Sequence, residues 1–228
     1  QNGWLKDKSI VVIGGTTGIG LSAAQAFIRE GANVVAIGRN AGSAEKARSL
    51  LKNAIVRTGD AAEAGAAAGA IQDCISHFGG FDGLYHVAGG SGRKFGDGPL
   101  HEITREGWDC TLTLNLTSLM LSNQAAVKAF LERKRPGSIL NMGSVLGYSP
   151  SPKYFVTHAY AAAKAAAKLG QRPRVEQITR ELLASDRLSD GWAAVAPPAA
   201  ASRSTPNLRR TKWHLRGPRL VAFSTDAR

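Results

Sequence analysis

Residues 9–20 read SIVVIGGTTGIG, a β-branched run that passes directly into a loop with glycines in the spacing G-x-x-x-G-x-G. Such a run bounded by glycines predicts a short buried strand. After the loop, Ile19, Ala23 and Phe27 recur at helical spacing, which predicts a helix over residues 18–30. The glycines let the backbone approach a pyrophosphate, and the helix beyond them offers free N–H groups and a positive dipole end. The stretch therefore favours dinucleotide binding over a loop that merely connects two elements.

Strand-like and helix-like segments alternate along the first two thirds of the chain. Short apolar runs are separated by segments with apolar residues at helical spacing. Strands separated by helices imply right-handed crossovers and an α/β fold with a doubly wound parallel sheet. The expected strands are residues 9–13, 33–37, 54–57, 83–87 and 137–142, and the expected helices are residues 18–30, 43–52, a segment through 71–78, 105–133 and one that begins near residue 157.

The composition is that of a chain with one globular domain. Its 228 residues are 43% hydrophobic and 20% charged, which suffices for a core and argues against extended disorder. No run of about 18 uncharged apolar residues is present, so neither a membrane-spanning helix nor a membrane partner is expected. The two cysteines, Cys74 and Cys110, lack metal-ligand spacing, so no metal site and no disulfide framework are expected. We expect them to be reduced, buried thiols of a cytoplasmic protein.

The basic charge is concentrated toward the end of the chain. The formal net charge is +12, of which residues 165–228 contribute +7 and residues 1–164 contribute +5. The shorter segment holds three of the 26 glycines and five of the nine prolines. We therefore expect a dinucleotide-binding and catalytic domain over residues 4–164 and an atypical basic segment over residues 165–228. Two explanations fit this segment: a shortened end of the same domain, or a reading-frame or sequence-assignment error, which peptide mass mapping would distinguish.

The glycine spacing differs from the G-x-G-x-x-G of most dinucleotide-binding dehydrogenases and resembles the classical short-chain dehydrogenase/reductase family. The resemblance extends over about residues 8–164 and implies a single Rossmann-like domain. Ile13 stands where the family has Thr. Within the glycine loop, the resemblance implies that the following residues bind the cofactor: Gly14, Thr16, Thr17, Gly18, Ile19 and Gly20.

Two further loops follow the family's pattern. Asp60 and Ala61, after the third expected strand, resemble the segment whose Asp contacts the adenine ring. Ala88 and Gly89 resemble the end of the family's N-A-G motif beside the cofactor, with Val87 in place of its Asn. His86 is expected to be a strand-end histidine rather than a catalyst.

The end of the second expected strand bears on the choice of nucleotide. A carboxylate at this point would hydrogen-bond the adenosine ribose hydroxyls and repel a 2′-phosphate. Gly38 occupies that position and Arg39 follows it. Because a guanidinium binds phosphate bidentately, the sequence favours NADP(H) over NAD(H). The alternative is that Arg39 is an ordinary solvated arginine.

Four residues match the family's catalytic positions. Tyr160 and Lys164 have the spacing Y-x-x-x-K, which places both side chains on one face of a helix. A tyrosine with a pKa of about 10 is a poor acid at neutral pH, and a nearby Lys charge favours its phenolate. In the family, the Tyr transfers the proton and the Lys assists it and holds the nicotinamide ribose. The resemblance assigns carbonyl polarisation to Ser144 and support of a water-mediated proton path to Asn115.

Beyond residue 164 the family pattern is interrupted. Pro173 is expected to end the helix that begins near residue 157, and a short helix is expected to restart over residues 175–182. Residues 194–198 (AVAPP) echo the family's P-G strand end, and residues 220–223 resemble a remnant of its last strand. The family's helix contacts imply a homodimer or homotetramer.

The resemblance implies an NADP(H)-dependent oxidoreductase that transfers a hydride between nicotinamide and a small-molecule carbonyl or alcohol. The alternative is a nucleotide-binding protein whose catalysis is impaired by its atypical C-terminal segment. The basic residues of that segment form no recognisable nucleic-acid motif, so no specific nucleic-acid partner is expected.

Overall fold

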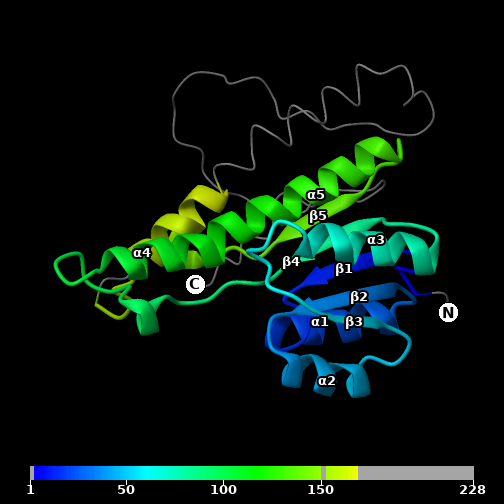
Figure 1. Cartoon of the computed structure of the whole chain (residues 1–228), viewed down its shortest axis with the longest axis horizontal. Coiled ribbons are helices and arrows are strands. Elements are labelled where there is room, and N and C mark those ends of the chain that lie inside the picture. Colours follow the sequence, from blue (N-terminus) through cyan, green and yellow to red (C-terminus); the bar gives the residue numbers. More distant parts are fainter. Residues whose placement is uncertain (1–2, 150–152, 169–228) are drawn as a thin grey trace, which may run out of the picture. The chain divides into compact units, whose positions relative to one another are not determined.

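The computed structural model describes residues 3–149 and 153–168. Within them, five parallel strands form one sheet in the order β3-β2-β1-β4-β5 (Figure 1). The order runs outward from β1 in both directions, as in a doubly wound α/β sheet, and confirms the predicted fold class. The strands are β1 (Ser9–Ile13), β2 (Asn33–Gly38), β3 (Ile55–Thr58), β4 (Gly83–His86) and β5 (Ser138–Asn141).

Helices cover both faces of the sheet (Figure 1). Successive residues of a strand point to opposite faces, so each buried strand contributes to two cores. Val11 and Val35 pack with residues of α3 (Ala66–Phe78) and α5 (Ser118–Glu132). Val12 and Val34 pack on the other face with residues of α1 (Gly18–Arg29) and α2 (Ala41–Leu50). The apolar runs that predicted the strands are therefore buried on both sides.

The long helix expected over residues 105–133 has three parts. A π-helical turn, η2 (Thr113–Thr117), separates α4 (Arg105–Leu112) from α5. A π turn inserts an extra residue into the helical ladder and is frequent at functional sites. Its effect here is to place the side chain of Asn115, which is fully buried, toward the loop after β4. Apolar spacing predicted the extent of the helix but not this turn.

Three short elements complete the described part of the chain. Two 3-10 turns, η1 (Arg93–Phe95) and η3 (Val145–Gly147), follow β4 and β5. Residues 158–168 are helical, as expected for the segment that carries Tyr160 and Lys164.

The two cysteines differ in burial, which corrects the expectation that both are buried. Cys74 on α3 is fully buried in the core, whereas Cys110 on α4 is partly exposed, and both are free thiols. Removal of the Cys74 thiol from water disfavours its thiolate and raises its pKa to about 12.

No helix in the described part of the chain is long and apolar enough to cross a membrane. Several sequence predictions lie outside the described residues. They are the helix end at Pro173, the helix over residues 175–182, the segments 194–198 and 220–223, and all of the basic segment beyond residue 168.

Candidate active site

A cavity of about 490 Å³ lies at the carboxyl ends of β1, β2 and β4. In a doubly wound sheet, ligands bind at this edge, where the strand order reverses between β1 and β4. Most residues that the sequence analysis assigned to cofactor binding line the cavity, namely Gly14, Thr16, Thr17, Gly18, Ile19, Arg39, Asp60, Ala61, Ala88, Gly89, Tyr160 and Lys164. Gly20, Asn115 and Ser144 do not line it.

The glycine loop is held in place by backbone contacts. The N–H groups of Gly14 and Gly15 both donate to the Ile37 carbonyl at 2.9 Å. Gly14 has φ +87°, and a Cβ there would lie 2.6 Å from the Ala88 nitrogen. At Gly20, a Cβ would lie 2.0 Å from the Gly14 oxygen. Gly20 therefore allows α1 to pack against the loop and has no contact with the cavity itself.

The N-terminus of α1 opens into the cavity with its backbone donors available. Thr17 precedes the helix and makes no side-chain capping bond, and the first turn carries no acidic residue. Gly18 lines the cavity, has φ +51°, and would direct a Cβ into open space. Free N–H groups at the positive end of a helix, with no competing carboxylate, match the chemistry of a pyrophosphate. The residues present therefore fit the phosphates of a dinucleotide.

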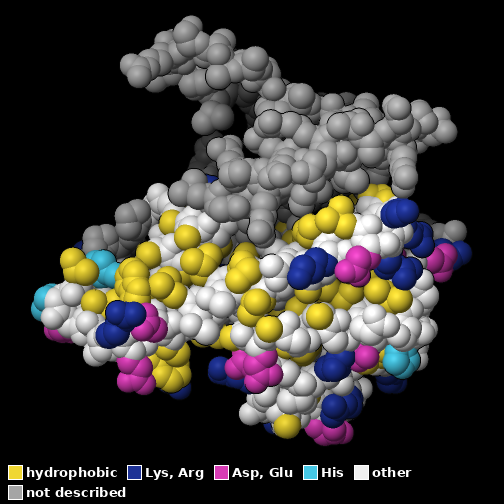
Figure 2. All heavy atoms as spheres, turned by 45° about the horizontal axis from the view of Figure 1, so that its top comes forward, with side chains coloured by type: hydrophobic (Ala, Val, Ile, Leu, Met, Phe, Trp, Pro, Cys, Tyr) yellow, Lys and Arg dark blue, Asp and Glu magenta, His cyan; other side chains and the backbone are white. Residues whose placement is uncertain are grey.

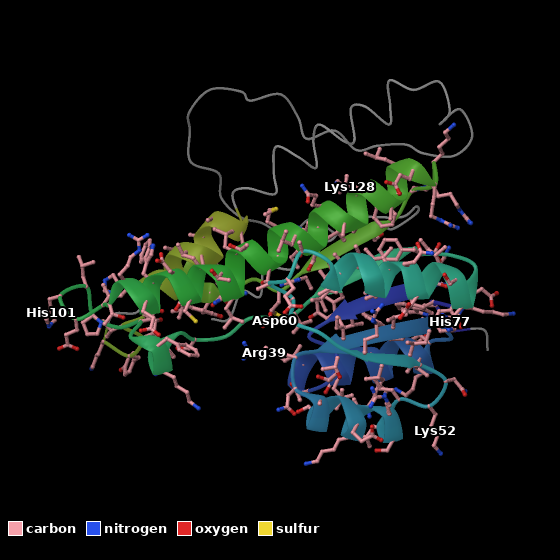
Figure 3. All side chains as sticks on the ribbon, viewed as in Figure 1. Arg39, Lys52, Asp60, His77, His101 and Lys128 are labelled. Carbon is pink, nitrogen blue, oxygen red and sulfur yellow. The ribbon has the colours of Figure 1, made fainter. Side chains whose placement is uncertain are left out.

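Arg39 and Asp60 stand together at another edge of the cavity (Figure 3). The Arg39 guanidinium lies 3.7 Å from the Asp60 carboxylate, and two thirds of the Arg39 side chain is exposed. At Gly38, a Cβ would lie 1.9 Å from the Thr16 hydroxyl oxygen, so a carboxylate-bearing residue does not fit there without displacing Thr16. Ser43, on the first turn of α2, also lines this edge.

Tyr160 and Lys164 form the opposite wall of the cavity. Lys164 is buried, and its Nζ donates to the Met142 carbonyl at 3.0 Å. The Nζ lies 5.7 Å from the centroid of the Tyr160 ring, as i and i+4 spacing on one helix predicts. Burial of the ammonium lowers the pKa of Lys164 below its ordinary value. An ammonium and a phenol therefore share one partly desolvated space.

The side chain of Asn115 holds the backbone of the loop after β4 that lines the cavity. Its Oδ1 accepts from Gly90 N at 3.0 Å, and its Nδ2 donates to the carbonyls of Gly90 at 2.8 Å and Thr111 at 2.9 Å. A Cβ at Gly89 would lie 2.7 Å from this Oδ1. The amide thus fixes the loop beside the cavity, and its own hydrogen-bonding groups are used in doing so.

Ser144 caps the start of η3, three residues after the end of β5, and is partly exposed. Its Oγ accepts from the Leu146 N–H at 3.3 Å. Met142, two residues earlier, lines the cavity and was not singled out from the sequence. Its contribution is its backbone carbonyl, which side-chain patterns do not report.

His86 connects β4 to α5 from within the core. Its Nδ1 lies 3.0 Å from the Ser122 hydroxyl, and its Nε2 lies 3.0 Å from the Ala88 carbonyl. Burial, with a smaller effect of the Lys164 charge, lowers the pKa of His86 from 6.5 to about 4. A neutral His86 therefore orients the residues that lead into the cavity wall.

Asp97, on the loop between β4 and α4, carries no signal in the sequence. It is almost completely buried, and its carboxylate accepts from the N–H groups of Ala159 and Tyr160, both at 3.0 Å. The 62 and 63 residues that separate the partners explain why local patterns do not reveal this contact.

Known proteins share this architecture. A relative from Xanthobacter autotrophicus named 2-(S)-hydroxypropyl-CoM dehydrogenase 3 is 34% identical over 79% of this chain and 66% of its own length. A 3beta-hydroxysteroid dehydrogenase 1 from Eggerthella lenta is 34% identical over 71% of this chain and 61% of its own. An inactive 2-(S)-hydroxypropyl-CoM dehydrogenase 2 from Xanthobacter autotrophicus is 34% identical over 71% and 64%. The matched region is therefore less than two thirds of each of these relatives.

Solved structures agree on the fold. A short chain dehydrogenase from Mycobacterium smegmatis superposes with a TM-score of 0.72 at 28% identity and covers 79% of this chain and 75% of that one. A second, from Bacillus anthracis str. 'Ames Ancestor', superposes with a TM-score of 0.71 at 24% identity over 78% and 73%. The sequence model of the short chain dehydrogenase family matches residues 8–172. The chain belongs to the short chain dehydrogenase family, whose members use a nicotinamide cofactor.

Proposed function

We propose that this chain is an NADP(H)-dependent oxidoreductase that interconverts a small-molecule carbonyl and its alcohol. One observation carries the proposal: a single cavity has the bare N-terminus of α1 on one wall and the Tyr160–Lys164 pair on the other. The first feature suits an anionic cofactor and the second suits proton transfer to a carbonyl oxygen.

The cofactor would be held mainly by backbone groups. The loop from Gly14 to Gly20 and the first turn of α1 would receive the pyrophosphate, and Asp60 and Ala61 would lie beside the adenine. Ala88 and Gly89 would flank the nicotinamide half. When bound, a nicotinamide cofactor supplies the hydride, and the protein supplies orientation and charge.

Tyr160 would move the proton at its phenolic oxygen. The ammonium of Lys164 is fixed by the Met142 carbonyl and shares the cavity with the phenol, so it lies beside the group that would exchange the proton. Lys164 would also bind the nicotinamide ribose, and Ser144 would polarise the substrate oxygen. General acid catalysis of this kind contributes about 10² to 10⁴ in rate.

Arg39 supports a preference for NADP(H) over NAD(H). It lines the cavity beside Gly38, where no carboxylate is present to repel a 2′-phosphate. The salt bridge to Asp60 spans 3.7 Å and most of the Arg39 side chain is exposed, so the guanidinium is available for a stronger anion.

A second candidate function is cofactor binding without turnover. The observation in its favour is that Ser144 does not line the cavity and that its Oγ already accepts from the Leu146 N–H. One relative of comparable identity is itself named inactive. In this second function, the glycine loop and Arg39 would still bind the cofactor, but no proton would be transferred.

The homo-oligomer implied by the family remains part of the proposal. Trp108 on α4 and Met120 and Leu131 on α5 are large apolar side chains with substantial exposure. On the face that Figure 2 presents, hydrophobic side chains lie among charged ones. Light scattering of the purified chain would give a dimer or tetramer mass if this face mediates assembly, and a monomer mass would overturn the expectation.

The test of activity uses the full chain with NADPH and a panel of ketones, aldehydes and 3-oxoacyl thioesters. Oxidation of NADPH, followed by absorbance, should be detected with at least one class. The Tyr160→Phe variant should lose about 10³-fold in kcat while it still binds NADPH, because only the proton donor is removed. NADPH binding without turnover on any class would favour the second candidate function.

A further inference from the structure

The helix that carries Tyr160 and Lys164 begins against a side chain from a distant loop. An α-helix leaves its first N–H groups without partners inside the helix. At residue 158, where this helix starts, the partner comes from the loop after β4. The Asp97 Oδ1 accepts from Ala159 N and its Oδ2 from Tyr160 N, both at 3.0 Å. The carboxylate thus binds the backbone of Tyr160 itself.

A second bond joins the same two segments. The Nδ1 of His158 donates to the Gly98 carbonyl at 2.9 Å. Three consecutive helical residues are therefore tied to two consecutive loop residues. Because these bonds fix position along and around the axis, they restrict both translation and rotation of the helix start.

The loop is itself fixed, so Asp97 is a rigid anchor. Asp97 N donates to the Gly92 carbonyl at 3.1 Å, and Thr104 N donates to the Gly96 carbonyl at 3.1 Å. At Gly107, on the first turns of α4, a Cβ would lie 2.5 Å from Asp97 N. The loop backbone and α4 thus approach as closely as glycine allows.

The charge of Asp97 is balanced by the helix. Asp97 is 3% exposed, and within the described residues it forms no salt bridge. A buried carboxylate without a cation is costly unless it is hydrogen-bonded. Two N–H donors and the positive end of the helix supply that compensation, which makes the contact strong and directional.

We infer that Asp97 is a positioning residue that sets the place of Tyr160 in the cavity. Asp97 does not line the cavity and acts through the backbone of Tyr160. α4 leads into the π turn of Asn115, which clamps Gly90, so the same helix positions both the loop wall and the tyrosine wall. The inference rests on the proposed role of Tyr160.

The test compares Asp97→Ala and Asp97→Asn with Asp82→Asn in the full chain. Asp82 is a matched control, because its Oδ2 also accepts a backbone N–H, that of Ser9 at 2.9 Å, at the opposite end of the sheet. Asp97→Ala should lower kcat about 100-fold, since small displacements of a catalytic group have effects of this size. Its affinity for NADPH should be unchanged. Asp97→Asn keeps one acceptor and should recover part of kcat, and Asp82→Asn should keep wild-type kcat.

Wild-type kcat in Asp97→Ala, measured well below its melting temperature, would overturn the inference. An equal loss of kcat in Asp82→Asn would also overturn it, because the effect would then reflect stability alone. If Asp97→Ala does not fold, the comparison of Asp97→Asn with Asp82→Asn decides in the same way.

A second readout does not depend on turnover. Amide hydrogen exchange in Asp97→Asn should increase for residues 158–164 and stay unchanged in α1. If the wild-type chain and Tyr160→Phe are equally inactive, the proposed function fails, and the exchange measurement still tests the anchor. Unchanged exchange over residues 158–164 would overturn it.

Discussion

The two walls of the cavity are built in different ways. The wall at α1 is made of backbone from one continuous stretch, residues 14–20, whose contacts run to the neighbouring strand ends. The wall at Tyr160 is made of side chains, and its fixing contacts come from residues that are distant in sequence, such as Asp97 and Met142. A binding surface for a charged cofactor can be local, whereas the proposed proton transfer would require several segments to converge.

The two walls are expected to respond differently to substitution. Loss of a glycine contact at the first wall should impair cofactor binding and leave the chemistry intact once cofactor is bound. Loss of a side chain at the second wall should impair mainly the rate, with a smaller loss of cofactor affinity at Lys164, which would also bind the nicotinamide ribose. Changes at Lys164, Gly20 and Arg39 test this separation, and a change at His86 tests the burial of a neutral side chain in the core behind the cavity.

The largest effect is expected at Lys164. Lys164→Met keeps the length of the side chain and removes the charge beside Tyr160, so kcat should fall about 10³-fold. Because burial of the ammonium disfavours its charged form, the variant should melt at or above the wild-type temperature. Rate and thermal denaturation are measured together. A variant that keeps the wild-type kcat would show that Lys164 has no role in the proposed proton transfer.

The next effect concerns His86 and pH. Folded His86 stays neutral down to about pH 4, whereas the unfolded chain binds this proton at about pH 6.5. The unfolded state therefore binds more protons in this window, and the free energy of unfolding should fall by about 3 kcal/mol as the pH drops through it.

Denaturant unfolding at several pH values measures this loss, and His86→Gln should remove it. His77→Gln is the control, because His77 is exposed on α3. Equal pH dependence in wild type and His86→Gln would contradict the burial of a neutral His86.

A smaller effect, on the first wall, is expected for Gly20→Ala. The added Cβ would meet the Gly14 oxygen, so α1 must move away from the loop. Overpacking of this kind costs about 1–3 kcal/mol and should weaken NADPH binding by about 10- to 100-fold. Gly65→Ala is the control, since a Cβ there meets nothing within 4 Å. Unchanged affinity in Gly20→Ala would show that the loop tolerates displacement.

The smallest effect is expected for Arg39→Ala. Loss of the guanidinium should weaken NADPH binding about tenfold, because the side chain is largely exposed, and should leave NADH binding unchanged. Arg48→Ala, which removes a surface arginine paired with Glu45 on α2, should change neither. Equal losses for both nucleotides would assign Arg39 a role in folding rather than in the choice of cofactor.

The sequence predicted the sheet because its central strands β1, β2 and β4 are short runs buried on both faces. All five observed strands fall within about two residues of their predicted bounds. The π turn at Asn115 was not predicted, because its helical residues keep ordinary spacing and the extra residue depends on tertiary contacts. The burial of Cys110 was predicted wrongly, since its helix turns that face partly toward solvent.

The sequence predicted those residues of the candidate site that belong to a short local motif. A glycine triplet and a Tyr–Lys pair are visible in sequence because they are local. Asp97 was missed because an acidic residue in a glycine-rich loop has no distinctive local pattern. Its hydrogen bond from the N–H of residue 160 forms only when the chain is folded. The carbonyl of Met142 was missed because every residue has one.

The most direct test of the central claim is a titration of the purified chain with NADPH and with NADH, followed by fluorescence. The proposed function predicts saturable binding of NADPH that is tighter than binding of NADH, because the bare α1 terminus would receive the pyrophosphate and Arg39 would receive the 2′-phosphate. Saturable binding of neither nucleotide would contradict the account, and the proposed roles of Tyr160 and Lys164 would fall with it.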